Sequence, residues 1–382
     1  MNARLLLTGN HAVAWAVKLS RPKVIPIYPI TPQTPIIEQI SEFMAQGELD
    51  AEVMTMESEH SAMSAAVTAS LSGVRVFTAT ASQGLLLMHE MLHWAAGSRA
   101  PIVMANVNRT VGSPWGFWPD QTDSLSQRDT GWIQYYCENG QESHDTIFQA
   151  FRVAEQVLVP AMVIHEAFYV SHAMEAINLV PQEVADRYLP AYQPLHRLDP
   201  THPESIGNTV PQAVFQKHRQ DMGEAMERAL DVARAADREL EALIGRGYGI
   251  LEKYRYENAQ LVIATMGSMT GTVRDAVDEL RDEGVPVGLL KLKLFRPFPV
   301  QDIRDAALGV PKILVLDRNF APGTGGALFQ EIKAALYGME KAPQVHGYLA
   351  GVGGTSISPA AIQQMARRAM AETPSPNSVW MG

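Results

Sequence analysis

The chain has 382 residues, of which 46% are hydrophobic and 19% charged, which favours about two or three folded domains and excludes a disordered chain. Its 31 Lys and Arg residues against 41 Asp and Glu residues give a formal net charge of -10, which argues against nucleic acid and anionic membrane surfaces as partners. The single cysteine, Cys137, excludes an internal disulfide and an iron–sulfur cluster held by this chain alone.

Short apolar runs alternate with helical patterns in the first half of the chain, beginning at Ala12. This alternation is typical of a parallel sheet covered by helices, so we expect a doubly wound α/β domain over residues 1–180. The expected strands lie at 24–28, 51–56, 74–79, 102–107 and 161–165, and the expected helices at 36–44, 59–72, 85–96 and 143–156.

A proline-rich segment follows this domain, with six prolines from Pro181 to Pro211. Proline at this density interrupts helices and strand ladders, so we expect an extended connector. A long amphipathic helix is expected at 216–244, and the connector and this helix together occupy 181–256. A second, smaller α/β domain is expected over 257–382, with strands at 260–264, 287–292 and 312–316 and a helix at 272–283.

Four polar or glycine-rich loops follow predicted strands or begin predicted helices of the first domain. They lie at 28–32, 57–60, 80–84 and 108–109. Ligands bind beyond the carboxyl ends of the strands in open α/β sheets. The sequence therefore predicts that these four loops converge on one crevice.

Three residues in these loops are candidates for chemistry. Thr31 precedes a predicted helix, where it is either a helix-capping or turn threonine or a group that helps to bind an anion at the helix N-terminus. Glu59 begins a helix, where it either complements the helix dipole or, if buried, acquires a raised pKa suited to proton exchange with a ring nitrogen. Arg109 follows a strand, so its guanidinium is either a carboxylate-binding group in the crevice or an ordinary surface charge.

The loop behind Arg109 is unusually apolar. Residues 111–123 include Trp115, Phe117 and Trp118. Loops that only connect two elements are seldom so rich in aromatic side chains. We expect this loop to be either a wall of a substrate pocket or a contact with another subunit.

Other features of the sequence do not point to a site. The glycine cluster at 322–326 lacks the dinucleotide fingerprint and that at 351–354 lacks the lysine of a P-loop, so both predict tight turns. His89 and His93 lack the glutamate of a zinc protease motif, and no metal site is expected within the chain. No apolar run approaches the roughly 18 residues that cross a bilayer, and the first is too short for a signal peptide, so we expect a cytoplasmic protein.

Several stretches, taken together, resemble one protein family. They are YPITPQTPI at 28–36, ESEHSAMSAAVTASLSGVRVFTATASQGLLLMHEML at 57–92, PIVMANVNRTVGSPWGFWPDQTDSLSQRDTGWIQYY at 101–136, LKLFRPFP at 292–299 and LAGVGG at 349–354. The chain is similar over nearly its whole length to the α subunit of 2-oxoacid:ferredoxin oxidoreductases, especially the pyruvate-type enzymes. This combination is far more specific than any single motif.

The resemblance implies an enzyme that uses thiamine diphosphate. It makes the first domain the one that holds the pyrimidine half of the cofactor, with Glu59 as the catalytic glutamate that hydrogen-bonds the ring nitrogen. It places Ile30 and Gln83 beside Glu59 as cofactor-binding residues, and it makes Thr31 and Arg109 the residues that bind the substrate carboxylate. The implied reaction releases carbon dioxide from a 2-oxoacid, passes two electrons singly to iron–sulfur clusters and transfers the acyl group to coenzyme A.

The resemblance also implies partner subunits. Thiamine enzymes commonly bind the diphosphate and its Mg²⁺ through a GDG motif, which this sequence lacks, as it lacks cysteines for clusters. The chain is therefore expected to be half of an active site, completed by a β subunit that binds the diphosphate, with γ and δ subunits and with Mg²⁺ and 4Fe-4S clusters on the partners. The second domain resembles the transketolase C-terminal domain and is expected to be structural and interfacial.

Several alternatives stay open at this point. The substrate is either pyruvate or an aryl 2-oxoacid such as phenylglyoxylate or indolepyruvate, because an aromatic loop suits a larger pocket. The final acceptor is either ferredoxin or NAD through a flavin subunit. A non-catalytic α/β scaffold subunit is the competing function. A nicotinamide dehydrogenase is disfavoured because 29–32 stands where a glycine fingerprint belongs.

Overall fold

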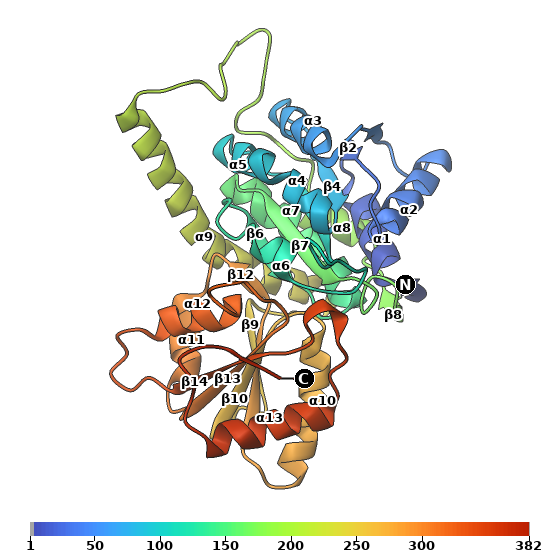
Figure 1. The fold of residues 1–382 in the computed structure, drawn as a ribbon. Coiled ribbons are helices and arrows are strands. Elements are labelled where there is room, and N and C mark those ends of the chain that lie inside the picture. The colour runs from blue at the N-terminus through green and yellow to red at the C-terminus, as the bar shows by residue number, and fades with distance from the viewer. Residues whose placement is uncertain (1–3, 382) are drawn as a thin grey trace.

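The computed structural model describes residues 4–381. Two α/β layers lie one above the other in Figure 1, the first built mostly from the N-terminal half of the chain and the second from the C-terminal part. The first layer holds a five-stranded sheet in the order β12-β6-β7-β5-β4, with the strand pairs β2-β3 and β1-β8 beside it. The second layer holds a six-stranded sheet in the order β15-β14-β13-β10-β11-β9.

The predicted strands of the first domain are all present. They are β2 (Val24–Ile27), β3 (Glu52–Thr55), β4 (Phe77–Thr80), β5 (Val103–Asn108) and β7 (Ala161–Glu166). Strands β4, β5, β7 and the unpredicted β6 (Ile133–Tyr136) pair in parallel, so their carboxyl ends lie at one edge of the sheet. An antiparallel ribbon of β1 (Arg4–Thr8) and β8 (Met174–Asn178) was also not predicted.

The helices of the first layer cover both faces of its sheet. They are α1 (Gly9–Ser20), α2 (Thr34–Ala45), α3 (Glu59–Leu71), α4 (Ser82–Leu87), α5 (His89–Gly97), the short α6 (Thr122–Leu125) and α7 (Gly140–Val157). The single helix expected at 85–96 is two helices, α4 and α5, which meet at Met88.

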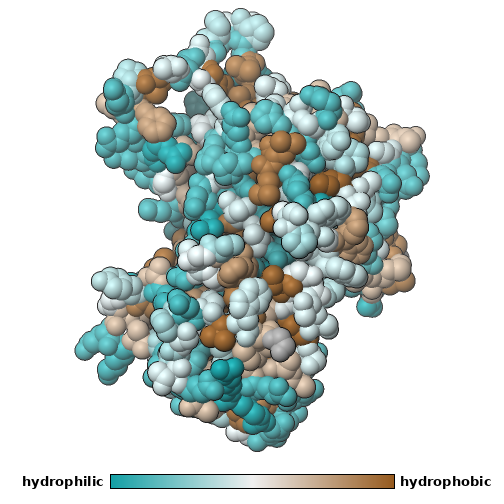
Figure 2. All heavy atoms as spheres, viewed as in Figure 1, coloured by the Kyte–Doolittle hydropathy of each residue, from teal (hydrophilic) through white to brown (hydrophobic). Residues whose placement is uncertain are grey.

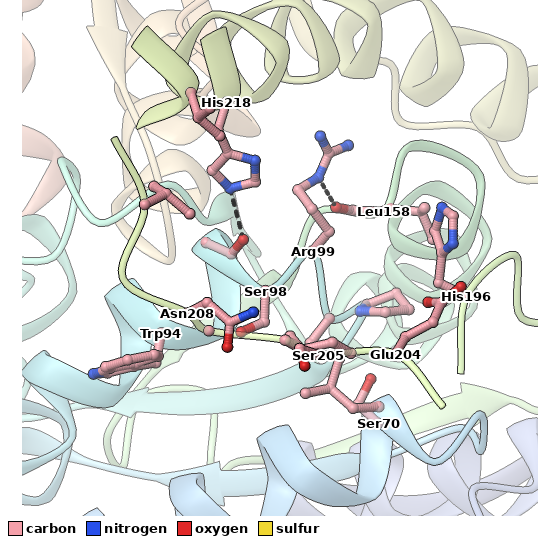
Figure 3. A pocket seen from close by; sticks show the side chains of 18 of the residues that line it. Ser70, Trp94, Ser98, Arg99, Leu158, His196, Glu204, Ser205, Asn208 and His218 are labelled. Carbon is pink, nitrogen blue, oxygen red and sulfur yellow. Dashed lines mark hydrogen bonds between the residues drawn. The ribbon is translucent and has the colours of Figure 1, made fainter. Parts of the chain in front are cut away.

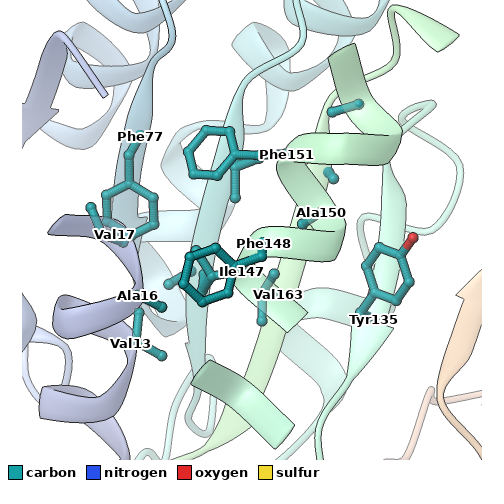
Figure 4. Close-up of a cluster of buried hydrophobic side chains, with 14 of the residues drawn as sticks. Val13, Ala16, Val17, Phe77, Tyr135, Ile147, Phe148, Ala150, Phe151 and Val163 are labelled. Carbon is teal, nitrogen blue, oxygen red and sulfur yellow. The ribbon is translucent and has the colours of Figure 1, made fainter. Parts of the chain in front are cut away.

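A large hydrophobic core lies between the sheet and helices α1 and α7. Figure 4 shows Phe148 and Phe151 of α7 facing Phe77 of β4, Val163 of β7 and Val17 of α1. All five side chains are completely buried. Burying one such side chain stabilises the fold by about 2 kcal/mol, so this core holds rigid the strands whose ends carry the candidate residues.

The second layer has the predicted α/β architecture with additional elements. Its strands are β9 (Leu251–Tyr254), β10 (Leu261–Thr265), β11 (Val287–Leu292), β13 (Lys312–Asp317), β14 (Gln344–Leu349) and β15 (Val379–Trp380). Its helices are α10 (Met269–Asp282), α11 (Val300–Ala307), α12 (Ala327–Leu336) and α13 (Pro359–Ala371). The two glycine clusters form turns as predicted: Ala321 N donates to Gly325 O at 3.0 Å, and η1 (Val352–Gly354) is a single 3-10 turn.

The expectation of a connector without regular structure was wrong at its start. Helix α8 (Gln182–Tyr188) forms there because Pro181 precedes its first turn and the next proline, Pro190, follows its end. Proline just outside a helix, or at its first position, does not interrupt the hydrogen-bond ladder. Residues 189–211 are irregular, and α9 (Gln212–Ile244) begins four residues before the predicted start at 216.

The two layers share strands and a helix. Strand β9 lies before residue 257 yet pairs with β11, and β12 (Leu294–Arg296) comes from the C-terminal half yet pairs with β6 of the first sheet. Helix α9 packs on α7 and runs along one side of the molecule towards the junction of the layers (Figure 1). The two layers are therefore joined through strand pairing and through α9.

The surface carries hydrophobic side chains in separate small groups on the face shown in Figure 2, among hydrophilic ones. Scattered exposed apolar side chains are normal for a folded protein. Within residues 4–381, no helix combines the length and the apolar character that crossing a membrane requires.

Candidate functional site

The four predicted loops meet at the carboxyl edge of the first sheet, which confirms that they converge. Arg109, at the end of β5, is 6% exposed, so the alternative of a surface arginine was wrong. Its Nη1 donates to the backbone oxygen of Thr31 and its Nη2 donates to Oε1 of Gln83 at 2.6 Å. The loop that begins α3 joins them through Glu59, whose carboxylate lies close enough to Arg109 for their charges to interact.

Glu59 is a buried acid in the first turn of α3. Its position is fixed by the preceding residue, because the Ser58 hydroxyl caps the helix by accepting from the Ser61 backbone N–H at 3.2 Å. Burial raises the pKa of the Glu59 carboxyl, and its own backbone N–H and the charge of Arg109 lower it by less. The result is a carboxyl that holds a proton more readily than an ordinary glutamate.

The backbone of Gly84 packs directly against that carboxyl. A Cβ atom at Gly84 would lie 2.5 Å from Oε1 of Glu59 and 2.6 Å from Oγ1 of Thr80. The Thr80 hydroxyl is buried and has no hydrogen-bond partner among the residues that the structure describes. A buried carboxyl with a raised pKa and an unpaired hydroxyl beside it are groups that would suit a heterocycle with a ring nitrogen, such as the aminopyrimidine of thiamine diphosphate.

Arg109 keeps a free hydrogen-bond donor in this crevice. Burial lowers the pKa of its guanidinium, whereas Asp123 and then Glu59 raise it. Its Nε is buried and unpaired within the described part of the chain. The rings of Trp115 and Phe117 stand over the guanidinium, with centroids 5.3 and 5.8 Å from its central carbon. A buried cation with a spare donor suits a small carboxylate.

Thr31 lies in a loop held in place by α1. The residue that precedes α2 is Gln33, and it makes no side-chain cap, so Thr31 does not cap that helix. The side chain of Thr31 is exposed, while the next carbonyl, that of Pro32, accepts from Nδ2 of the buried Asn10 at 2.7 Å. Ile30 is half-buried and packs on the hydrophobic core. The loop thus presents the Thr31 carbonyl to Arg109.

The aromatic loop bridges the two layers. Trp118 packs on Phe168, with ring centroids 5.4 Å apart, and lies so close to Gly354 that a Cβ there would be 2.4 Å from the Trp118 Cβ. Trp115 and Phe117 are 55% and 47% exposed, so each has one face on Arg109 and another in solvent. This geometry suits a wall of the crevice and leaves surface for a subunit contact.

Asp123, which sequence reasoning missed, is buried at the centre of the site. Its carboxylate accepts from the backbone N–H groups of Ser82 at 3.0 Å and Arg109 at 3.3 Å, and from the side chains of Asn106 and Asn108. Burial raises its pKa to about 6. No local pattern in 111–123 marks this acid, because its partners come from two other strand ends.

A separate cavity of about 470 Å³ lies between α5, the irregular segment before α9 and the start of α9 (Figure 3). Its walls include Trp94, Asn208 and His218, whose Nε2 lies 2.8 Å from the Gly97 oxygen. None of the candidate residues Glu59, Arg109 and Thr31 lines it. This cavity is therefore separate from the place where the four loops meet.

The titratable groups of the described residues give no sign of a metal centre. No group of three or more His, Cys, Asp or Glu side chains in 4–381 is arranged to hold a metal ion. Cys137 is buried, and burial raises the pKa of its thiol to about 12. That thiol is therefore neutral near pH 7.

Two family descriptions match the chain. Residues 15–238 match "Pyruvate flavodoxin/ferredoxin oxidoreductase, thiamine diP-bdg", and residues 259–362 match "Pyruvate:ferredoxin oxidoreductase core domain II". The chain is 47% identical over 379 residues to the pyruvate synthase subunit PorA of Methanothermobacter thermautotrophicus, covering 99% of this chain and 97% of that protein. It is 48% identical over 363 residues to the ketoisovalerate oxidoreductase subunit VorA of Pyrococcus abyssi, covering 94% and 92%.

Two solved structures share the fold. A 2-oxoglutarate:ferredoxin oxidoreductase from Magnetococcus marinus, with 2-oxoglutarate, coenzyme A and succinyl-CoA bound, gives a TM-score of 0.75 at 20% identity over 97% of this chain. The chain spans 66% of the length of that longer chain. A split-gene transketolase, an inactive β4 tetramer, gives a TM-score of 0.57 at 12% identity over 96% of this chain and 98% of its own. These likenesses confirm the α/β, transketolase-like fold.

Proposed function

The chain belongs to the 2-oxoacid:ferredoxin oxidoreductase family, and from this premise we propose that it is the α subunit of a thiamine diphosphate-dependent enzyme that converts a 2-oxoacid and coenzyme A to an acyl-CoA and carbon dioxide. The observation that carries the proposal is that a buried carboxyl, Glu59, and a buried guanidinium with a spare donor, Arg109, lie close enough for their charges to interact where the four loops meet. The Glu59 carboxyl suits a heterocyclic cofactor, and the Arg109 guanidinium suits a substrate carboxylate.

Glu59 is the proposed catalytic residue. When bound, thiamine diphosphate supplies the nucleophilic carbon and the electron sink that decarboxylation of a 2-oxoacid requires. The Glu59 carboxyl, with its raised pKa, would exchange a proton with the pyrimidine nitrogen of the bound cofactor. Gly84 lets the backbone pack against this carboxyl and so helps to fix its position, and Gln83 and Ile30 are the proposed flanking contacts.

Arg109 and Thr31 are the proposed carboxylate-binding residues. The unpaired Nε of Arg109 donates to one carboxylate oxygen, and the exposed hydroxyl of Thr31 donates to the other. Trp115 and Phe117 shield the guanidinium from water on one side, which strengthens its attraction for an anion. Together the two groups would fix the carboxylate end of the substrate.

The proposed substrate is pyruvate or a branched aliphatic 2-oxoacid. This choice is supported by relatives named for pyruvate and for ketoisovalerate, both at nearly half identity over more than nine tenths of the chain. An aryl acid such as phenylglyoxylate is the second candidate, because Trp115 and Phe117 offer ring faces beside the carboxylate site.

The proposal includes partner subunits for the remaining chemistry. A β subunit would bind the diphosphate and Mg²⁺, and γ and δ subunits would complete the complex with iron–sulfur clusters that pass electrons to ferredoxin, or to NAD through a flavin subunit. The single, buried Cys137 supports the assignment of the clusters to other chains. The named relatives are themselves described as subunits.

The test is 2-oxoacid-dependent and coenzyme A-dependent dye reduction by the purified complex, with pyruvate, ketoisovalerate and phenylglyoxylate compared. Glu59→Gln is expected to lower kcat by about 100-fold or more, the usual worth of a general acid–base group, with assembly preserved. The matched control is Glu57→Gln, an exposed neighbour. Full activity of Glu59→Gln would favour the scaffold function, and no activity of the unaltered complex with any 2-oxoacid would overturn the proposal.

A further inference from the structure

Asp123 connects the ends of two strands of the first sheet. It lies on α6, and its side chain is completely buried. From the end of β4 it accepts the backbone N–H of Ser82, and from the end of β5 it accepts the backbone N–H of Arg109 and the amides of Asn106 and Asn108. One carboxylate thus joins the loop that carries Gln83 to the loop that carries Arg109.

Only a carboxylate satisfies this arrangement. Every group that faces the Asp123 oxygens from these two loops is an N–H donor, and a carboxylate is an acceptor at both oxygens. An asparagine at position 123 would turn an NH₂ group towards at least one of these donors. The backbone at Ser82 is in the left-handed region, with φ of 51°, so this turn depends on the bond that it donates.

The segment that carries Asp123 is fixed to the second layer. The backbone N–H of Gln121 donates to the Arg318 oxygen at 3.1 Å, and its Nε2 donates to Oε1 of Glu166 at 2.8 Å. Arg318 in turn donates to Oε2 of Glu166 at 2.7 Å, and both side chains of this pair are almost fully buried. The second layer therefore fixes the segment of Asp123, and Asp123 in turn bonds the backbone of Arg109.

We propose that Asp123 is a positioning residue for substrate binding, which sets the place of the Arg109 guanidinium through the backbone of Arg109 and through the Ser82–Gln83 turn. This inference rests on the function proposed above, in which Arg109 binds the 2-oxoacid carboxylate. It also gives the second layer a role beyond scaffolding, because Gln121, Glu166 and Arg318 hold the Asp123 segment in place.

The test is Asp123→Asn in the assembled complex, with two readouts. The first is the affinity for oxamate, a non-reacting analogue of pyruvate, measured by calorimetry, and the second is the split between KM and kcat. We expect Kd for oxamate and KM for the 2-oxoacid to rise about tenfold, the worth of one charge-assisted hydrogen bond, with kcat changed far less. An unchanged Kd in a folded Asp123→Asn complex would overturn the inference.

The matched control is Asp145→Asn, which removes an equally buried aspartate that bonds Arg246 and Tyr248 away from the crevice. Asp145→Asn is expected to lower stability and to leave the Kd for oxamate unchanged. If Asp145→Asn raised this Kd as much as Asp123→Asn does, the role of Asp123 would be structural only. If the Asp123→Asn complex fails to assemble, Asn106→Ala is tested in its place. A Kd for oxamate in the Asn106→Ala complex equal to that of the unaltered complex would then overturn the inference. Failure of the proposed function would look different, because the unaltered complex would bind no oxamate.

Discussion

Gly84 and Glu59 are so close that a Cβ atom on the glycine would lie 2.5 Å from the glutamate Oε1. We therefore expect Gly84→Ala to displace the Glu59 carboxyl from its position against the backbone of α4. The expected result is a fall in activity of about 100-fold and a loss of stability of about 1 to 3 kcal/mol from overpacking. Both are measured on the purified complex, by dye reduction and by thermal unfolding.

The control for this change is Gly97→Ala. Gly97 ends α5, and a Cβ atom there would meet nothing within 4 Å. Because alanine favours a helix more than glycine does, Gly97→Ala is expected to be neutral or to stabilise by up to about 1 kcal/mol. Full activity of Gly84→Ala would show that catalysis does not depend on the position of the Glu59 carboxyl.

Arg109→Lys tests the geometry of carboxylate binding. A lysine keeps the charge but loses the planar fork, so it cannot hold the Thr31 oxygen and Gln83 and still present a donor to the substrate. We expect KM for the 2-oxoacid to rise about 10- to 100-fold, while KM for coenzyme A stays unchanged. Arg152→Lys, whose arginine pairs with the exposed Glu239, is the control. Equal rises in both KM values would contradict a specific role in binding the carboxylate.

Trp115→Ala distinguishes the two interpretations of the aromatic loop. If Trp115 limits the space beside Arg109, its removal raises kcat/KM for bulky 2-oxoacids relative to pyruvate by roughly tenfold. Differences of this size are typical when the size of a hydrophobic pocket determines specificity. If the loop is a subunit contact, the substrate ratio stays constant and the complex dissociates more readily on gel filtration. Trp94→Ala, which removes another exposed tryptophan next to the separate cavity, is the control.

The sequence predicted those elements whose signal is local. Strands such as β10 were found because a parallel strand buried on both faces is an apolar run. Strand β6, with the sequence IQYY, was missed because its Gln134 and tyrosines do not form such a run. Strand β12 was missed because its three residues are a strand only through pairing with β6, more than 150 residues away.

The prediction of the site residues was limited in the same way, to residues with a local signal in the sequence. Glu59 and Arg109 were found because each stands beside an element that the sequence predicts, and the family resemblance selected them from equally polar neighbours. Asp123 was missed because its role depends on donors at the ends of β4 and β5, which only the folded chain brings together. A buried polar network that spans three segments leaves no periodic signal in any one of them.

Asp145 gives the fold a predictable dependence on pH. Burial on α7 raises the pKa of its carboxyl, but hydrogen bonds from His144 and Arg246 outweigh this and bring it to about 2, below the usual 3.8. A carboxyl with a lowered pKa contributes stability that is fully present above its unfolded pKa and is lost as the pH falls through its folded pKa. This difference between the folded and unfolded pKa contributes about 2 kcal/mol to the free energy of unfolding.

We therefore expect Asp145→Asn to lower the free energy of unfolding by about 2 kcal/mol at pH 7, and the difference from the unaltered protein to shrink between about pH 4 and pH 2. Urea denaturation at a series of pH values measures both. Asp221→Asn is the control, because the Asp221 side chain is 44% exposed and pairs with Lys217 on the surface of α9, where ion pairs contribute little. A destabilisation by Asp145→Asn that stayed constant down to pH 2 would mean that lost packing, and not the carboxylate charge, causes it.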